Sequence, residues 1–397
     1  MGDDLQVQGF VGAAVAAHIR KKDRLDLALI YSEVPAVAAG VFTTSLVKAA
    51  PVRLGMERLQ GGRAQAIMIN SGIANACTGA EGMRLARATG KMVADGLGIA
   101  EELVQVSSTG VIGEQLRPDP FSAAMPGLIG KLSADGLADV ARAIMTTDLV
   151  PKTAVRTVTV GGKEVKLVGV AKGSGMIMPN MATMLGFVLT DAAVAPNALA
   201  GMLKTAADCS FNRITVDGDT STNDTVLLLA NGLAGNPVID DGATDKAVFQ
   251  AVLNDLMKDL ALQIVRDGEG ATKLITIRVT GAASDEAAVA AARTIANSNL
   301  VKTAFFGEDA NWGRIIAALG RSGIDFDADR VDIAFDDVQM VANGLGQGAA
   351  VESRATAVLK RKEFSVNIDL HGGNGCGEMY TCDFSLDYVK INADYRS

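Results

Sequence analysis

The stretch that decides the fold runs from Lys172 to Leu185 and reads KGSGMIMPNMATML. Its two glycines can adopt backbone conformations that other residues avoid, whereas Pro179 fixes its own φ angle and favours an extended residue before it. We therefore expect the chain to leave a hairpin, pass the glycine pair, and follow a short apolar strand towards Thr183. Such a segment can hold a hydroxyl group against the carbonyl that precedes it.

On its residues alone the segment fits either a Gly- and Met-rich strand that packs in the core or a chain that cleaves itself before Thr183. The Thr183 hydroxyl attacks the Ala182 carbonyl, the acyl group shifts from nitrogen to oxygen, and water hydrolyses the ester. The α-amine freed on Thr183 has an ordinary pKa of about 7.7–8.0, which suits a general base at neutral pH. One residue thus supplies nucleophile and base, in a chain whose two histidines, His18 and His371, lie in no recognisable nucleophile motif.

The segments on both sides of this stretch mix strands and helices, which predicts an α/β fold with α+β layers. The period of the apolar residues, with Gly and Pro as breaks, sets the expected elements. We expect strands at 27–32, 64–70, 104–106, 187–190, 273–279, 331–335 and 364–370, and a hairpin over 153–171 that turns at Gly161 and Gly162. We expect helices at 81–96, 120–145 (broken at Pro126 and near Gly136), 197–208, 245–265, 285–297 and 351–361.

Length and composition limit the class of protein. A chain of 397 residues exceeds the usual size of one core, so two structural units are expected. The net charge of −8 argues against a nucleic-acid partner. No apolar run is long enough to span a membrane, and the acidic start MGDDLQVQGF does not resemble a signal peptide, which indicates a cytoplasmic protein. The four cysteines match no zinc motif, so we expect reduced, buried thiols and no metal.

The block at 172–185 resembles the processing segment of the ornithine acetyltransferase (glutamate N-acetyltransferase) family over fourteen uninterrupted positions. The similarity extends along the chain in further blocks that also resemble the family. These blocks are NSGIANACTG at 70–79, VSSTGVIG at 106–113, FNRITVDGDTSTND at 211–224, DANWGR at 309–314 and YVKINADYRS at 388–397. Two positions depart from the pattern, Ile73 in place of the more usual Asn and Ser397 where Thr is also common.

The resemblance implies a self-processing fold of the N-terminal-nucleophile type, as in ornithine acetyltransferases and self-processing aminopeptidases. It implies cleavage between Ala182 and Thr183 into an α chain, 1–182, and a β chain, 183–397, which assemble as an α₂β₂ heterotetramer. Thr183 is then the nucleophile, and Thr109 and Gly110 form the oxyanion hole. The residues agree with this placement, because a strand ending in Ser-Ser-Thr-Gly presents a hydroxyl and an open N–H side by side.

The resemblance also implies the reaction, which moves the acetyl group of N-acetylornithine to glutamate in arginine biosynthesis by a ping-pong mechanism. It requires no metal and no bound cofactor, and it leaves open whether acetyl-CoA is a second acetyl donor. Lys172 is expected to bind the substrate carboxylate, and Glu269 the ornithine ammonium. The positions that the resemblance assigns to substrate binding are Thr146, Lys172, Thr183, Glu269, Asn392 and Ser397.

Two other classes of function stay open on the sequence. A self-processing threonine or serine hydrolase would pass the acyl group to water, and a binding protein would not cleave itself at all. A dinucleotide-binding motif at Gly344, Gly346 and Ala349 is less favoured, since Glu363 begins its expected strand, whereas the ribose-binding acid ends one.

Overall fold

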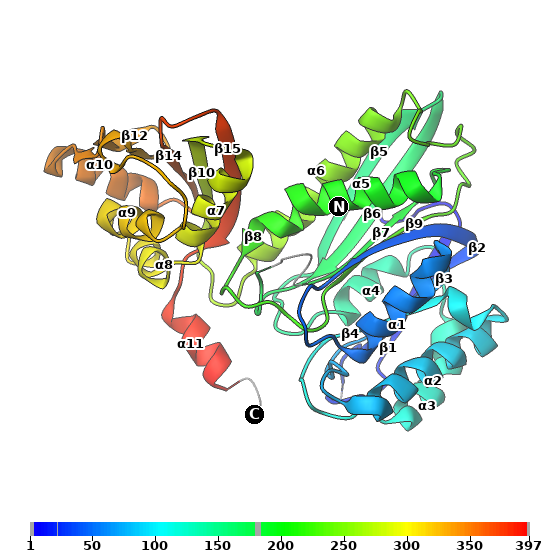
Figure 1. The fold of residues 1–397 in the computed structure, drawn as a ribbon. Helices are drawn as coiled ribbons and strands as arrows, with labels where there is room; N and C mark the ends of the chain where they lie inside the picture. The colour runs from blue at the N-terminus through cyan, green and yellow to red at the C-terminus, as the bar shows by residue number, and fades with distance from the viewer. Residues whose placement is uncertain (1–3, 22, 179–183, 395–397) are drawn as a thin grey trace. The chain divides into compact units, whose positions relative to one another are not determined.

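Two mixed sheets, each covered by helices, organise the chain (Figure 1). The structure is a computed structural model that describes residues 4–21, 23–178 and 184–394. Unit 1 consists of Met1–Asn212 and Asp219–Ile264, and unit 2 of Arg213–Gly218 and Val265–Ser397. The predicted α/β class and the expected division into two units are therefore confirmed. The boundary between the units does not follow the predicted processing halves, because residues from both halves build unit 1.

Unit 1 contains a sheet with the strand order β4-β3-β2-β9-β7-β6-β5, and β1 pairs with β2 at its side. Its strands are β1 (Phe10–Val15), β2 (Leu27–Phe42), β3 (Arg63–Asn70), β4 (Val104–Ser108), β5 (Lys152–Val160), β6 (Lys163–Lys172), β7 (Leu185–Thr190) and β9 (Thr225–Ala230). Its helices are α1 (Ala50–Arg58), α2 (Gly79–Leu97), α3 (Pro118–Gly130), α4 (Leu137–Ala143), α5 (Pro196–Cys209) and α6 (Lys246–Arg266), with short turns at Leu59–Gly61, Glu101–Leu103 and Phe211–Arg213.

This sheet is buried on both faces, which explains its nearly continuous apolar strands. In β2, Ala28 and Ile30 face a core shared with α4, whereas Leu27 and Leu29 face a second core shared with α1, α2 and α3. Alternate residues of one strand thus belong to two different cores. α5 packs against β2. Figure 1 shows α6 beside the part of the sheet that contains β5 and β6, where Leu256 and Leu260 lie next to Gly169.

Two strands from the second half of the chain lie inside the sheet of unit 1. β9 pairs antiparallel with β2 and parallel with β7, and β7 pairs antiparallel with β6. β9 and β7 therefore occupy the centre of the sheet between β2 and β6, strands that precede Thr183 in sequence. Backbone hydrogen bonds on both sides hold the two halves of the chain in one sheet.

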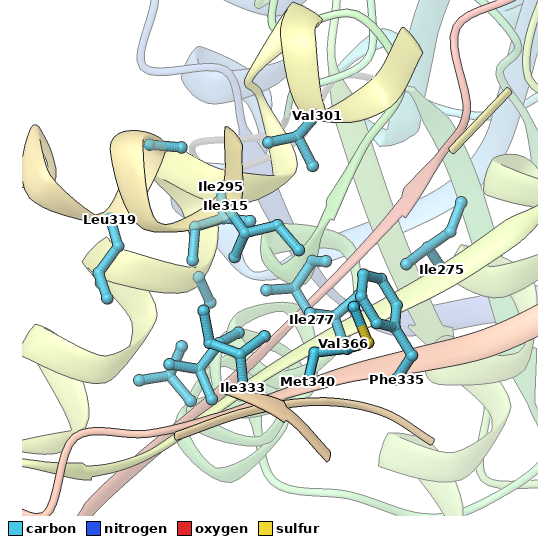
Figure 2. Packing of buried hydrophobic residues seen from close by; sticks show 14 of the residues in the cluster. Ile275, Ile277, Ile295, Val301, Ile315, Leu319, Ile333, Phe335, Met340 and Val366 are labelled. Atoms are coloured by element: carbon cyan, nitrogen blue, oxygen red, sulfur yellow. The ribbon is translucent and has the colours of Figure 1, made fainter. Parts of the chain in front are cut away.

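Unit 2 contains a second sheet with the order β13-β12-β11-β14-β10-β15-β8. Figure 2 shows how Ile275, Ile277 and Val366 of the sheet face Ile295 and Ile315 of its helices in one buried cluster. The strands are β8 (Ile214–Thr215), β10 (Leu274–Ala282), β11 (Asp332–Phe335), β12 (Val338–Ala342), β13 (Leu345–Gly346), β14 (Glu363–Asp369) and β15 (Gly375–Cys382). The helices are α7 (Asp285–Ala296), α8 (Asn299–Phe306), α9 (Trp312–Gly320), α10 (Ala349–Leu359) and α11 (Leu386–Ala393), with a short turn at Ala328–Arg330.

Most expected elements are present, and two need physical correction. β2 does not end at residue 32 but continues past Pro35. Pro35 is exposed and lies where the pairing of β2 with β3 shifts register. No backbone N–H has to donate a hydrogen bond to β3 at that point, so proline is tolerated. Pro126 does not break its helix but lies within α3. A proline has no N–H to donate to the carbonyl four residues earlier, which here belongs to Ser122. Ser122 is exposed, so water can bind that carbonyl instead. The predicted hairpin is confirmed, with Gly161 and Gly162 both at positive φ.

The cysteine prediction is partly wrong, because Cys77, Cys209 and Cys376 are exposed. Cys382 is buried, and none of the four cysteines forms a disulfide with another. Within the described ranges, no helix combines the length and the apolar character that crossing a membrane requires.

A close backbone contact fixes α4, the helix that leads to Thr146. Gly12 in β1 and Ser133 exchange two backbone hydrogen bonds, and a Cβ placed on Gly136 would lie 1.8 Å from the Gly12 carbonyl oxygen. We expect Gly136→Ala to lower the free energy of unfolding by about 1–3 kcal/mol, because the backbones must separate. Urea unfolding of the variant measures this loss.

Gly127→Ala is the matched control, since no atom lies within 4 Å of its added Cβ and Gly127 lies in α3. Alanine should there stabilise the helix by up to about 1 kcal/mol. Equal unfolding free energies for the two variants would contradict the packing argument.

Candidate active site

The candidate site is built around the end of β6, where Lys172 pairs with Leu185 of β7. The chain leaves the sheet after Lys172 and returns to it at Leu185. The expected apolar strand in this loop is not present over Gly173–Met178, and the positive φ angle occurs at Met176 (φ 56°) rather than at Gly173. Gly173 instead allows close packing, since an added Cβ would lie 3.0 Å from Ile177 Cδ1. The predicted cleavage site, Ala182 and Thr183, lies outside the described residues.

Lys172 joins two of the other predicted site residues. Its Nζ donates a hydrogen bond to Thr146 Oγ1 at 2.8 Å and to Thr109 Oγ1 at 3.2 Å. These three residues come from β6, from the segment after α4, and from the residue following β4. Lys172 is only 8% exposed, so its charge acts in a partly desolvated setting where electrostatic interactions are strong.

Asp148 holds this arrangement in place. Its fully buried carboxylate accepts hydrogen bonds from Lys152 Nζ at 2.7 Å, from the Gly173 N–H at 2.8 Å and from the Thr146 N–H at 2.9 Å. Lys172 Nζ lies 3.9 Å from Asp148 Oδ2, the oxygen that also accepts the hydrogen bond from Thr146. Burial alone would raise the pKa of Asp148, but Lys172, Lys152 and the hydrogen bonds lower that pKa well below its usual range. Lys172 thus presents a nearly buried ammonium group between the Thr109 and Thr146 hydroxyls.

Asn70 fixes the end of β4, where the predicted oxyanion hole of Thr109 and Gly110 lies. The Thr109 N–H donates to the Asn70 carbonyl at 3.0 Å, and the Ser108 hydroxyl donates to Asn70 Oδ1 at 2.7 Å. Gly110 has a φ of 130°, and a Cβ there would lie 2.2 Å from the Gly72 carbonyl carbon. Only glycine fits position 110, so the backbone itself requires Gly110 after Thr109.

Unit 2 carries the remaining predicted residues. Asn392 in α11 donates a hydrogen bond to Glu269 Oε2 at 2.8 Å, and Glu269 is 7% exposed. The loop that contains Glu269 is tied to the start of α11, because the Ser385 hydroxyl donates to the Gly270 carbonyl at 2.6 Å. Ser397 lies outside the described residues. The structure thus brings together Thr109, Thr146 and Lys172 in unit 1, and Glu269 with Asn392 in unit 2.

Asp148 and Lys152 were not identified from the sequence. The only sequence signal for this pair was weak: Asp148 follows Thr146 by two residues, and Lys152 follows Asp148 by four. Ion pairs on the protein surface show the same spacing equally often. Burial distinguishes them, since both side chains are 0% exposed. Among the residues that the structure describes, no group of three His, Cys, Asp or Glu side chains is placed to hold a metal ion.

Comparisons with known proteins identify the family and the fold. A model of the ArgJ family matches residues 12–397. The arginine biosynthesis bifunctional protein ArgJ of Desulfotalea psychrophila is 57% identical over 393 residues, 99% of this chain and 100% of that protein. Its counterpart in Geobacter sulfurreducens is 54% identical with the same coverage. The crystal structure of the Bacillus halodurans protein of this name has 48% identity and a TM-score of 0.52, covering 53% of this chain and 99% of that one. The likeness confirms the predicted fold type.

Removing the buried charge of Asp148 should destabilise the protein. We expect Asp148→Asn to lower the free energy of unfolding by about 3–5 kcal/mol, because Lys152 is left buried without its counter-ion. Because the folded-state pKa of Asp148 is lowered, its contribution is present above the unfolded pKa of about 3.9 and is lost as the pH falls through the folded value. Chemical unfolding from neutral to acidic pH measures both effects.

Asp139→Asn provides the control, since Asp139 pairs with Arg142 at 3.2 Å on the exposed surface of α4. Its loss should cost at most about 1 kcal/mol. A cost for Asp148→Asn as small as that of Asp139→Asn would show that the buried carboxylate does not stabilise the site.

Proposed function

The chain belongs to the ArgJ family, and from this premise we propose that it transfers acetyl from N-acetylornithine to glutamate through an acetyl-Thr183 intermediate. As a member of this family it is an acyltransferase enzyme of arginine biosynthesis. In the proposal the chain first cleaves itself between Ala182 and Thr183. The fragments 1–182 and 183–397 then form the enzyme, with Thr183 as the new N-terminus.

One observation carries the proposal, namely that both ends of the processing loop lie beside Lys172. Lys172 ends β6 and pairs with Leu185 of β7. Thr183 precedes Leu185 by two residues, and two residues of chain reach at most about 7 Å. This reach is what supports a nucleophile at Thr183, because Leu185 pairs with Lys172, whose Nζ contacts Thr109 and Thr146.

The roles in the proposed reaction follow from the chemistry of each group. The Thr109 hydroxyl and the Gly110 N–H stabilise the oxyanion, and each such donor contributes about 2.7–4 kcal/mol. The Lys172 ammonium binds the substrate carboxylate, with Thr146 beside it. Glu269, held by Asn392, binds the ornithine ammonium, and Ser397 completes the substrate site as the resemblance implies.

The proposed cycle is ping-pong. Thr183 takes the acetyl group, ornithine leaves, and glutamate attacks the acetyl-enzyme to give N-acetylglutamate. The Thr183 amine carries the proton in both halves, so the cycle uses no metal and no bound cofactor. The names of the relatives contain the word bifunctional. If this chain also has two activities, acetyl-CoA is its second acetyl donor.

The solved relative supports the division of the chain. The Bacillus halodurans polypeptide is matched over 99% of its length but covers only 53% of the present chain, so it is about half as long. The proposed cleavage at Thr183 would divide this chain into two such halves. We propose that two pairs of halves assemble as α₂β₂ in the cytoplasm.

Transfer and cleavage are tested together on Thr183→Ala. Wild-type protein should appear as fragments 1–182 and 183–397 in denaturing mass spectrometry. It should also convert labelled N-acetylornithine and glutamate into labelled N-acetylglutamate without CoA. Thr183→Ala should stay whole and lose more than about 10⁴-fold of the transfer rate, because nucleophile and base are both absent.

Thr157→Ala is the control, because Thr157 is an exposed threonine of β5. It should cleave and transfer as the wild type does. Release of free acetate without N-acetylglutamate would instead identify a hydrolase. Glutamate acetylation from acetyl-CoA alone would identify the second activity.

The interleaved sheet predicts that cleavage does not separate the halves. The strands β9 and β7 follow Thr183 yet lie between β2 and β6, which precede it. We expect both fragments to co-elute in native size-exclusion chromatography, at the volume of uncleaved Thr183→Ala protein, and to separate only in denaturant. Independent elution of the fragments would contradict the sheet order.

A further inference from the structure

Glu269 lies at the centre of a tight turn in unit 2. The Ala271 N–H donates to the Gly268 carbonyl at 2.9 Å, which closes a turn of four residues with Glu269 and Gly270 in the middle. Gly270 has a φ of 68°, a left-handed conformation that favours glycine. This turn presents the Glu269 side chain, but its place in unit 2 depends on what binds the chain around it.

The side chain of Asp383 binds the chain directly after this turn. Its Oδ1 accepts hydrogen bonds from the Thr272 N–H at 2.8 Å and from the Lys273 N–H at 3.0 Å. Its Oδ2 accepts a hydrogen bond from the Thr272 hydroxyl at 2.5 Å. Asp383 is 2% exposed, so water does not replace these bonds easily when they break. Asp383 thus fixes the chain on the C-terminal side of the Glu269 turn.

The residues that follow Asp383 hold the turn itself. The Ser385 hydroxyl donates to the Gly270 carbonyl at 2.6 Å, and Asn392 Nδ2 donates to Glu269 Oε2 at 2.8 Å. In the described part of the chain, no group donates a hydrogen bond to Glu269 Oε1. Three side chains of one segment therefore bind the turn, and one oxygen of Glu269 can accept a hydrogen bond from a ligand.

Lys302 of α8 sets the position of Asp383. Its Nζ donates to the Cys382 carbonyl and, at 2.9 Å, to Thr381 Oγ1, and its own carbonyl accepts a hydrogen bond from the Phe384 N–H at 3.2 Å. Lys302 is 1% exposed. The peptide units on both sides of Asp383 are thus bound by one buried residue, which connects the place of the Glu269 turn to a helix of the unit 2 core.

We propose that Asp383 is a positioning residue for Glu269 and thereby sets the preference of the enzyme for an acetyl donor with a cationic side chain. A carboxylate distinguishes a cationic side chain from a neutral one only where it lies close to the arriving charge, because their attraction falls with distance. A misplacement of about 1 Å can cost about 10²-fold in rate. This inference rests on the proposed function, in which Glu269 binds the ornithine ammonium.

Two acetyl donors that differ only in the ammonium group test the proposal. N-acetylnorvaline has the carbon skeleton of N-acetylornithine without its side-chain amine. The measurement is the ratio of kcat/KM for N-acetylornithine to that for N-acetylnorvaline, with glutamate as acceptor. This ratio does not change with the fraction of active enzyme, so a loss of stability alone does not move it. Asp383→Ala should lower the ratio by about 10–100-fold, because the Glu269 turn is released.

Conservative variants distinguish the hydrogen bonds of Asp383 from its charge. Asp383→Asn should keep most of the preference, since its side-chain oxygen accepts both N–H groups and its amide can donate to the Thr272 hydroxyl oxygen. Thr272→Val removes one of the three bonds and should lower the ratio less than Asp383→Ala does. If Asp383→Ala does not fold, an unchanged ratio in Thr272→Val would overturn the proposal.

Asp336→Ala is the matched control in unit 2. Asp336 also binds a backbone N–H, that of Ser365 at 2.7 Å, and it pairs with Arg361 at 2.9 Å. It has no contact with the Glu269 turn, so its loss should leave the ratio unchanged. An equal fall of the ratio in Asp336→Ala and Asp383→Ala would assign the effect to unit 2 as a whole and overturn the proposal.

Combination with Glu269→Gln shows whether Asp383 acts through Glu269. Glu269→Gln alone should lower the ratio, and Asp383→Ala added to it should lower the ratio no further, because the charge that Asp383 positions is gone. A further fall of the full size would overturn the proposal, as would a wild-type ratio in Asp383→Ala. An unchanged ratio in Glu269→Gln alone is a separate outcome, since it contradicts the role of Glu269 in the proposed function and this inference with it.

Discussion

The pairing of Lys172 with Leu185 across β6 and β7 is the constraint on which the candidate site depends. It forces the loop between them to begin and end at the same point of the sheet. The Asp148 carboxylate fixes that point, because it binds the Gly173 N–H as well as the Thr146 N–H and Lys152. One buried carboxylate thus connects the loop, the cation and the hydroxyl that the proposed reaction uses. The central place of β7 and β9 in the sheet explains how a chain could be cut here without losing its fold.

The charges around Lys172 divide into two settings with different chemistry. Asp148 is surrounded by ammonium groups and N–H donors, which keep it ionised and make it a structural anchor. Asp224 is buried near the same lysine, and burial raises its pKa against the smaller effects of Ser221, Thr43 and Lys172. The lowered pKa of Asp148 arises mainly from the charges of Lys172 and Lys152 rather than from depth, since both side chains are buried.

The sequence predicted the elements whose apolar period is long and regular, such as α2 and the β5–β6 hairpin. It did not predict β9, although TVLLLA is apolar throughout, because a short run buried on both faces resembles a helix segment equally well. The expectation that proline ends a strand or breaks a helix was wrong for β2 and for α3. Pro35 lies at a register shift, and Pro126 leaves unpaired only a carbonyl that solvent can reach, so neither proline loses a necessary hydrogen bond. Thr109, Thr146 and Lys172 were found through motifs. Asp148 depends on burial and on partners far away in sequence, such as Gly173, which local patterns do not contain.

The central claim is that Thr183 carries the acetyl group, and trapping the intermediate tests it most directly. Purified wild-type protein is mixed with N-acetylornithine in the absence of glutamate, quenched in acid, and digested for peptide mass spectrometry. The account predicts one added acetyl group on the peptide that begins with Thr183, and its loss when glutamate is added before the quench. A Thr183 peptide that stays unmodified while N-acetylglutamate still forms would contradict the account.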